Sequence, residues 1–334
     1  MRVAVTHPNA ETRARWCAEI EARLPDARAF GWMPEGSEDL APLAAISPVA
    51  ALADARKPAP AIPLTADYAI GWRPSEAFFR SVRGLKAFFS TGAGVDHVLD
   101  EPAYPADLPL IRLEDAGMAQ QMAEYCSYEV IRLYHHRARY AAQQRALTWH
   151  EIQPVPRERF GVGVLGLGVL GTAVARTLAG FGYPVRGYAR SPREVAGVSC
   201  FSGDALPAFL SGCQVLILMV PLTAQTTDLV DRRLLALLPT GAHLVNVARG
   251  ALVVDEHLLA ALDSGRLGGA TLDVFRHEPL PAGHPFWTHP KVRITPHVAA
   301  ITLVAESARQ VADKIDRLER GLPVSGVVER GRGY

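Results

Sequence analysis

Short apolar segments alternate with segments of helical periodicity along almost the whole chain. A helical segment repeats its apolar residues every three or four positions, whereas a buried strand of a parallel sheet is apolar throughout. Patterns of the helical kind occur at 76–82, 118–140, 169–181, 255–262 and 302–320, and another ends near Leu24. Segments of strand length occur at 2–6, 27–32, 67–72, 85–90, 110–113, 160–165, 184–188, 215–220, 242–247, 269–274 and 292–295. This alternation predicts an α/β protein whose parallel sheets carry helices on their faces.

Several of these helices have recognisable ends. Asn9 or Thr12 could cap the first helix, and Asp255 is predicted to cap the helix that runs to Leu262. The pattern at 118–140 is the longest uninterrupted one in the first half, and it predicts one helix that bridges two domains. The last helix, 302–320, is amphipathic and could return to the first domain, which would make that domain discontinuous.

The segment 34–65 differs from the rest because it is rich in alanine and proline. Proline interrupts any long helix, so one or two short helices on a surface excursion are expected there. We assign this segment no chemistry.

Length and composition limit the class of protein. A chain of 334 residues is long enough for two domains of about 150 residues each, and 49% apolar residues can fill their cores. The net charge is +1 and no basic block stands out, which argues against a nucleic-acid partner.

The cysteines and the N-terminus bear on location. Cys17, Cys126, Cys200 and Cys213 lie far apart without a CxxC pair, which indicates reduced thiols rather than a disulfide framework or a zinc site. His284 and His289 likewise lack a supporting carboxylate or thiol cluster, so we assign no metal. Because no signal peptide and no stretch of about 18 apolar residues is found, a cytoplasmic protein is expected.

A glycine motif follows the strand at 160–165. Gly166, Gly168 and Gly171 have the spacing GxGxxG, and a helix at 169–181 and a strand at 184–188 come after them. In such a motif the glycines permit a tight turn, close approach of a pyrophosphate and close packing of the helix, whose N-terminus favours a phosphate. A glycine-rich core turn is the alternative, but the order of strand, motif, helix and strand favours dinucleotide binding.

The residues after the strand at 184–188 bear on which dinucleotide is bound. An acidic residue there usually binds the ribose 2′-hydroxyl of NAD, and none is present. Arg190, Ser191 and Arg193 stand there instead and would suit a 2′-phosphate, unless both arginines are simply solvated charges. NADP(H) is therefore the predicted cofactor, with NAD(H) possible.

Further cofactor contacts are expected where later strands end. Asp273 could bind the cofactor amide or simply end its strand, and both interpretations stay open. The remaining candidates are Leu167, Val169 and Leu170 in the glycine motif, Val220, Pro221 and Thr226 after the strand at 215–220, and Val247 and Ala248 at the end of 242–247.

Two groups of residues have the chemistry of a 2-keto acid reductase. The small-residue turn at 91–96 could present backbone N–H groups to a carboxylate, or be an ordinary glycine turn. Arg249, Glu278 and His297 follow successive strand ends and would share one edge of a doubly wound sheet. Arg249 would bind the carboxylate, His297 would donate the proton, and Glu278 would stabilise the imidazolium. Taken singly, such residues are usually surface charges, but three complementary groups at one edge favour catalysis.

These stretches resemble the D-isomer specific 2-hydroxyacid dehydrogenase family across essentially the whole chain. The matching stretches are STGAGVD at 90–96, GVLGLGVLG at 163–171, VPLTAQT at 220–226, NVARG at 246–250, LDVFRHEP at 272–279 and TPHVAA at 295–300. Within the family, LEDAGMAQQMAEY at 113–125 and the terminal RGRGY resemble the glyoxylate/hydroxypyruvate reductase A group.

The resemblance carries expectations for the fold and the site. It implies two doubly wound domains with a cleft between them: a flavodoxin-like substrate domain at 1–115, a Rossmann domain at 116–298, and a C-terminal helix and tail at 299–334 that return to the substrate domain. Arg249, Glu278 and His297 match the catalytic trio, Ala93 and Gly94 match the carboxylate-binding loop, and Trp72 falls where the group lines its substrate pocket. The resemblance also implies a D-hydroxy acid product and a homodimer built mainly through the cofactor domains.

Three functions are weighed. The main hypothesis is NADPH-dependent reduction of glyoxylate or hydroxypyruvate to glycolate or D-glycerate. The second keeps the chemistry but shifts the substrate to a bulkier 2-keto acid or the direction to oxidation. The third is a nucleotide-sensing binding protein, since fold does not fix function, although the intact trio argues against it.

Overall fold

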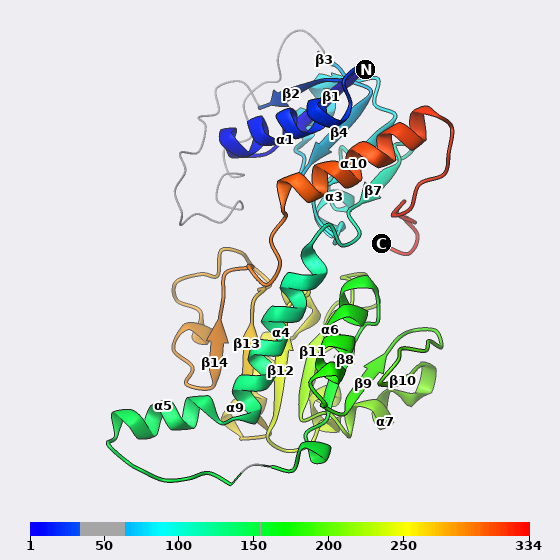
Figure 1. The fold of residues 1–334 in the computed structure, drawn as a ribbon. Helices are drawn as coiled ribbons and strands as arrows, with labels where there is room; N and C mark the ends of the chain where they lie inside the picture. The colour runs from blue at the N-terminus through cyan, green and yellow to red at the C-terminus, as the bar shows by residue number, and fades with distance from the viewer. Residues whose placement is uncertain (34–63, 154) are drawn as a thin grey trace. The chain divides into compact units, whose positions relative to one another are not determined.

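The protein forms two compact units, described one at a time below (Figure 1). The terminal unit comprises Met1–Gly117 and Thr302–Tyr334, and the central unit comprises Met118–Ile301. This computed structural model describes residues 1–33, 64–153 and 155–334. The short helices expected within 34–65 therefore fall almost entirely outside the described residues.

The terminal unit contains a five-stranded parallel sheet. Its strands in spatial order are β2 (Arg28–Trp32), β1 (Arg2–Thr6), β4 (Tyr68–Gly71), β6 (Ala87–Ser90) and β7 (Leu110–Arg112). Counted along the chain within this sheet, the order is 2-1-3-4-5, which is the flavodoxin-like arrangement. The short strands β3 (Leu64–Thr65) and β5 (Val82–Arg83) pair separately.

Helices α1 (Ala10–Arg23) and α10 (Val304–Glu319) pack against each other in the terminal unit. Asn9 caps α1, because its side chain accepts a hydrogen bond from the Thr12 N–H. The apolar face of α10 is buried, so the C-terminal helix belongs to the same unit as the N-terminal strands. Two shorter helices, α2 (Glu76–Ser81) and α3 (Asp96–Leu99), complete the unit.

The central unit contains a seven-stranded parallel sheet. Its strands in spatial order are β10 (Val198–Phe201), β9 (Val185–Tyr188), β8 (Val162–Leu165), β11 (Val215–Leu218), β12 (Ala242–Asn246), β13 (Leu267–Leu272) and β14 (Val292–Ile294). The order along the chain is 3-2-1-4-5-6-7, a Rossmann sheet with one added strand, whose direction of winding reverses between β8 and β11. The predicted fold class of two doubly wound parallel sheets is confirmed.

The last residues of these strands form a continuous row. Successive neighbours across the sheet are Tyr188, Leu165, Leu218, Asn246, Leu272 and Ile294. The segments that follow the strands therefore leave the sheet from one edge, and the residues expected to bind cofactor and to act in catalysis all lie in those segments.

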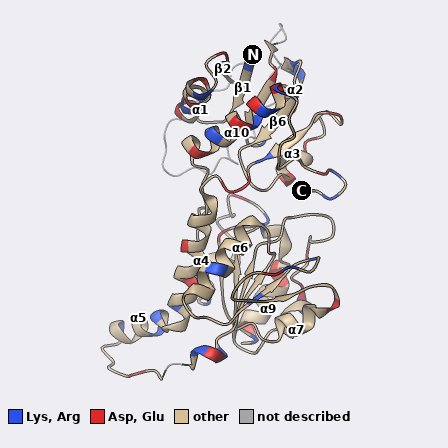
Figure 2. Ribbon diagram, turned by 45° about the vertical axis from the view of Figure 1, so that its right-hand side comes forward, with Lys and Arg blue, Asp and Glu red and all other residues tan. Residues whose placement is uncertain are grey.

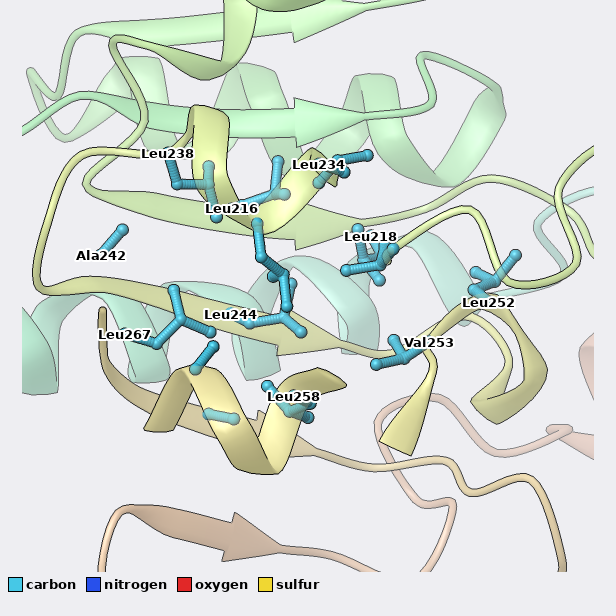
Figure 3. Close-up of a cluster of buried hydrophobic side chains, with 14 of the residues drawn as sticks. Leu216, Leu218, Leu234, Leu238, Ala242, Leu244, Leu252, Val253, Leu258 and Leu267 are labelled. Carbon is cyan, nitrogen blue, oxygen red and sulfur yellow. The ribbon is translucent and has the colours of Figure 1, made fainter. Parts of the chain in front are cut away.

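Alternating strand residues serve two cores in the central unit. Leu216, Leu218 and Leu244 pack with Leu234 of α8 (Arg232–Leu237) and Leu258 of α9 (Asp255–Asp263), as Figure 3 shows. The other face of the sheet packs against α4 (Met118–Tyr134) and α6 (Val169–Gly180), with Ile217, Cys126 and Val174 among the buried side chains. Because both faces are covered, the strands read as nearly continuous apolar runs. A short helix, α7 (Leu206–Leu210), follows β10.

The prediction of a single helix over 118–140 is wrong. The helix α4 ends at Tyr134, His136 has a φ of 50° in the left-handed region, and α5 (Arg137–Arg145) begins after it. The apolar face that holds α4 against the sheet stops at this point, and none of the residues of α5 is buried. Figure 1 shows α5 projecting away from the sheet of the central unit.

The predicted cap of α9 is also wrong, by one residue. The N-cap is Val254, and Asp255 is the first helical residue. The Asp255 carboxylate faces Nε2 of His284 at 3.5 Å.

In the described part of the chain, no helix is both long and apolar enough to cross a membrane. Figure 2 shows acidic and basic positions mixed along α10.

Candidate active site

The glycine loop after β8 has the geometry of a pyrophosphate-binding turn. Gly166 has a φ of 112°, which favours glycine. A Cβ atom at Gly171 would lie 1.9 Å from the Gly166 carbonyl oxygen, so only glycine allows α6 to approach the loop this closely. A Cβ atom at Gly168 would meet no atom within 4 Å, so that side of the loop is open. Turn, open face and close packing are the three properties that a dinucleotide needs here.

The start of α6 can receive an anion. Its N-cap is Gly168, which has no side chain to cap the first N–H groups. These groups and the positive end of the helix dipole attract phosphate. Within the loop, Leu167 is buried, Leu170 is half-buried and Val169 is exposed. The loop therefore fits the dinucleotide predicted from the sequence.

The arginine-rich turn after β9 contacts the glycine loop. Arg193 donates a hydrogen bond from Nη1 to the Leu167 carbonyl at 2.8 Å. Arg190 and Ser191 are exposed on the same turn, directly after Tyr188, whose strand neighbour is Leu165. Positive charge thus lies beside the loop.

The loop after β11 is shaped by its threonines. The Thr226 hydroxyl accepts a hydrogen bond from the Thr223 N–H at 2.8 Å and donates to the Pro221 carbonyl at 2.7 Å. The hydroxyl therefore holds the conformation of the segment that includes Val220 and Pro221.

Asn246 holds the turn that carries Arg249. Its side chain donates to the Arg249 carbonyl at 2.9 Å and accepts from the Ala248 N–H at 3.1 Å, and it is buried. Val247 lies between Asn246 and Ala248 in this turn. At Gly250, a Cβ atom would lie 1.8 Å from the carbonyl carbon of Phe275, so the turn packs directly against the segment that leads to Glu278.

Glu278 and His297 form a hydrogen-bonded pair. The distance from Nδ1 of His297 to Oε2 of Glu278 is 2.9 Å, and the Phe275 N–H donates to Oε1 at 2.9 Å. The His297 side chain is 36% exposed and that of Glu278 is 16% exposed, so the imidazole is the more accessible partner. With Nδ1 engaged, Nε2 is the ring nitrogen that can exchange a proton with a substrate.

The environment of Glu278 keeps it ionised. Burial raises the pKa of this carboxyl group, but the hydrogen bond and charge of His297, the Phe275 N–H and the charge of Arg249 together lower the pKa below its usual value. Glu278 is therefore an anion at neutral pH.

Asp273 holds both sides of the His297 backbone. Its carboxylate accepts hydrogen bonds from the Thr295 hydroxyl at 2.6 Å and from the N–H groups of Val298 and Ala299 at 2.9 Å each. The His297 N–H donates to the Asp273 carbonyl at 2.7 Å, and His297 has a φ of 57°, which few non-glycine residues adopt. The carboxylate is thus engaged within the protein as a support of this turn.

The terminal unit contains the other expected residues. Ala93 and Gly94 are half-buried in the turn after β6, and Trp72 follows β4. The Trp72 ring stacks on His97 with a centroid distance of 3.7 Å, and a Cβ atom at Gly92 would lie 2.2 Å from the indole. Gly92 and His97 together fix the position of this ring.

Sequence reasoning missed several residues that shape these loops: Gly92, His97, Tyr125, Asn246, Gly250 and Thr295. All of these except His97 stand inside the motif stretches, so their position in the sequence was a signal for them. The contact itself between Tyr125 and Thr295 gave no signal, because the two residues are 170 positions apart. Among residues 1–33, 64–153 and 155–334, no three His, Cys, Asp or Glu side chains gather as a metal site requires.

Comparisons with known proteins show the family of the chain. Residues 128–299 match the family model described as "D-isomer specific 2-hydroxyacid dehydrogenase, NAD binding domain". The glyoxylate/hydroxypyruvate reductase A of Yersinia enterocolitica is 39% identical over 340 residues, and that of Serratia proteamaculans is 42% identical over 342 residues. Each alignment covers 100% of both proteins.

Solved structures of two similar proteins have the same fold as this chain. A D-isomer specific 2-hydroxyacid dehydrogenase from Xanthobacter autotrophicus in complex with NADPH and MES is 36% identical with a TM-score of 0.87, covering 99% of both chains. An NADPH-dependent glyoxylate/hydroxypyruvate reductase from Sinorhizobium meliloti in complex with NADP and sulfate is 32% identical with a TM-score of 0.85, covering 100% of this chain and 99% of that one.

Fold, glycine loop and relatives together define an NAD(P)-dependent oxidoreductase. The chain belongs to the D-isomer specific 2-hydroxyacid dehydrogenase family.

Alanine substitutions of Gly171 and Gly168, at the start of α6, should affect stability and NADPH affinity differently. Gly171→Ala forces a methyl group against a backbone oxygen, so we expect a loss of about 2 kcal/mol or more in stability together with weak NADPH binding. Gly168→Ala meets no atom of the protein and costs only the poorer helix N-cap that alanine makes, about 1 kcal/mol or less, while NADPH affinity falls about tenfold or more. Thermal unfolding and fluorescence titration with NADPH and NADH measure the two effects. Equal NADPH affinity in Gly168→Ala and the unmodified protein would contradict the assigned binding face.

Proposed function

We propose that the protein reduces glyoxylate or hydroxypyruvate to glycolate or D-glycerate, with NADPH as the preferred cofactor. The observation that carries the proposal is the Glu278–His297 pair beside the Arg249 turn, on the same sheet edge as the dinucleotide loop. The relatives named above support the substrate class, because those from Yersinia, Serratia and Sinorhizobium are glyoxylate/hydroxypyruvate reductases.

The residues of the chain divide the work of reduction among them. The Arg249 guanidinium binds the substrate carboxylate and polarises the adjacent carbonyl. His297 gives the proton on Nε2 to the carbonyl oxygen as it gains charge, and Glu278 holds the proton on Nδ1 and stabilises the imidazolium. When bound, the reduced nicotinamide supplies the hydride. In the terminal unit, we assign the backbone of Ala93 and Gly94 to carboxylate binding and Trp72 to the lining of the substrate pocket.

A substrate panel tests the proposal. Purified protein is offered glyoxylate, hydroxypyruvate, pyruvate and phenylpyruvate, each with NADPH and with NADH, and cofactor oxidation is followed by absorbance. We expect the highest kcat/KM for glyoxylate or hydroxypyruvate with NADPH. A higher value for phenylpyruvate would overturn the small-substrate assignment, and NADPH binding without any turnover would favour a sensing role.

The arginine turn should decide between the two dinucleotides. We expect Arg190→Ala to lower the ratio of NADPH to NADH affinity about tenfold or more, because a guanidinium pairs with the 2′-phosphate that NADH lacks. Arg193→Ala should do the same and also loosen the glycine loop, since Arg193 holds the Leu167 carbonyl. Arg176→Ala, an exposed arginine on α6, is the matched control. An unchanged ratio in Arg190→Ala would remove this residue from the site.

The pair should also set the pH dependence of reduction. His297 must carry its proton to act as the acid, so kcat/KM falls as the pH rises and the imidazolium is lost. Glu278→Gln removes the carboxylate whose pKa the His297 hydrogen bond and charge lower, so the fall should move toward acid. Glu256→Gln, an exposed glutamate in the first turn of α9, controls for a simple loss of charge. A pH profile that coincides with that of the unmodified protein would argue against the pairing.

We also propose a homodimer built mainly through the central unit. An arm at 137–149 consists of α5 and the four residues after it. None of the α5 side chains is buried, and Leu147 and Trp149 are almost completely exposed. Large apolar side chains exposed together usually mark an interaction surface. Sedimentation equilibrium should give twice the chain mass of 36.1 kDa, and a monomer mass would contradict the proposal.

A further inference from the structure

One face of α4 makes side-chain hydrogen bonds at three successive turns. Gln121, Tyr125 and Glu129 are four residues apart, so they lie in a stripe along the helix. Gln121 exchanges hydrogen bonds with the backbone of Ile301 at 3.0 and 3.2 Å, the Tyr125 hydroxyl lies 2.6 Å from that of Thr295, and Thr271 donates to Glu129 at 2.8 Å. The first two of these contacts bracket the segment that contains His297.

The contact between Tyr125 and Thr295 has a definite direction. Thr295 has one hydroxyl proton, and it donates that proton to Oδ1 of Asp273 at 2.6 Å. Thr295 must therefore accept from Tyr125, whose phenol is the donor. Burial raises the pKa of Tyr125 to about 12 against a smaller lowering by the Thr295 hydrogen bond, so the phenol keeps its proton across the working range of pH.

The chain of donors ends at the group that fixes the His297 turn. Asp273 accepts the Thr295 hydroxyl on one side of His297 and the Val298 and Ala299 N–H groups on the other. Without the Tyr125 hydroxyl, the Thr295 hydroxyl loses the donor that orients it toward Asp273. The left-handed backbone of His297 is a conformation that persists only where its surroundings enforce it.

We propose that Tyr125 and Thr295 are positioning residues for His297, which act through Asp273 to hold the imidazole against Glu278. This inference rests on the proposed role of His297 as proton donor. Glu129 has a different task on the same stripe, because it forms a buried ion pair with Arg132 at 2.6 Å and joins α4 to β13.

Tyrosine-to-phenylalanine changes on α4 provide a matched test. Tyr125→Phe removes the hydroxyl and keeps the ring. Tyr134→Phe makes the same change about two and a half turns away, where the ring packs on Phe160 and Tyr183. Thr295→Val removes the second hydroxyl in the row of hydrogen bonds from Tyr125 through Thr295 to Asp273. Thr295→Ser keeps a hydroxyl at this position.

Two measurements are made on each variant. The first is the proton NMR resonance of the His297 Nδ1–H, identified by its loss in His297→Gln. The second is steady-state reduction with the best substrate of the panel. In Tyr125→Phe and Thr295→Val we expect the resonance to move upfield or broaden, and kcat to fall about five- to tenfold while KM for NADPH stays within about twofold. Tyr134→Phe and Thr295→Ser should resemble the unmodified protein in both measurements.

The outcomes separate the positioning role from the proposed activity. An unchanged resonance and an unchanged kcat in Tyr125→Phe would overturn the positioning role. Equal losses in Tyr125→Phe and Tyr134→Phe would overturn it as well, because the effect would then be general loosening of α4. The resonance needs no substrate, so its shift in Tyr125→Phe would uphold the positioning of His297 even if the substrate panel gave no turnover.

Discussion

The candidate catalytic loop depends on the hydrogen bonds that the Asp273 carboxylate accepts. A buried carboxylate is costly unless several donors surround it, and here three donors come from residues 295, 298 and 299. The same contacts compensate for the charge and bend the chain into the left-handed turn at His297. At this turn the Nδ1 atom of His297 meets Glu278, which lies in the segment after β13.

The edge of the central sheet explains why so many functional candidates lie close together. All its strands are parallel and end in one row, so every segment that follows a strand starts from the same edge. Close approaches at Gly171 and Gly250 then bring the dinucleotide loop against α6 and the Arg249 turn against Phe275. Parallel strand order distributes the residues along the edge, and glycine sets how tightly the segments pack.

Local patterns made the strands, the glycine loop and the proximity of Glu278 to His297 predictable from the sequence. Apolar runs report burial on both faces of a sheet, and the motif spacing reports a turn whose geometry is local. The break at His136 was not predictable because the residues after it tolerate a helix, and only the end of the buried face reveals it. The contact of Tyr125 with Thr295 was equally hidden, since it spans 170 residues and follows no repeat.

The division of the chain also has a consequence for synthesis. The central unit is one continuous segment, whereas the terminal unit needs α10, which comes after it in the chain. On a ribosome, the central unit can fold while the first 117 residues still lack the helix that packs on α1. Residues 1–117 are thus made before the central unit but complete their fold after it. A truncation after Ile301 removes α10, which packs on α1 in the terminal unit.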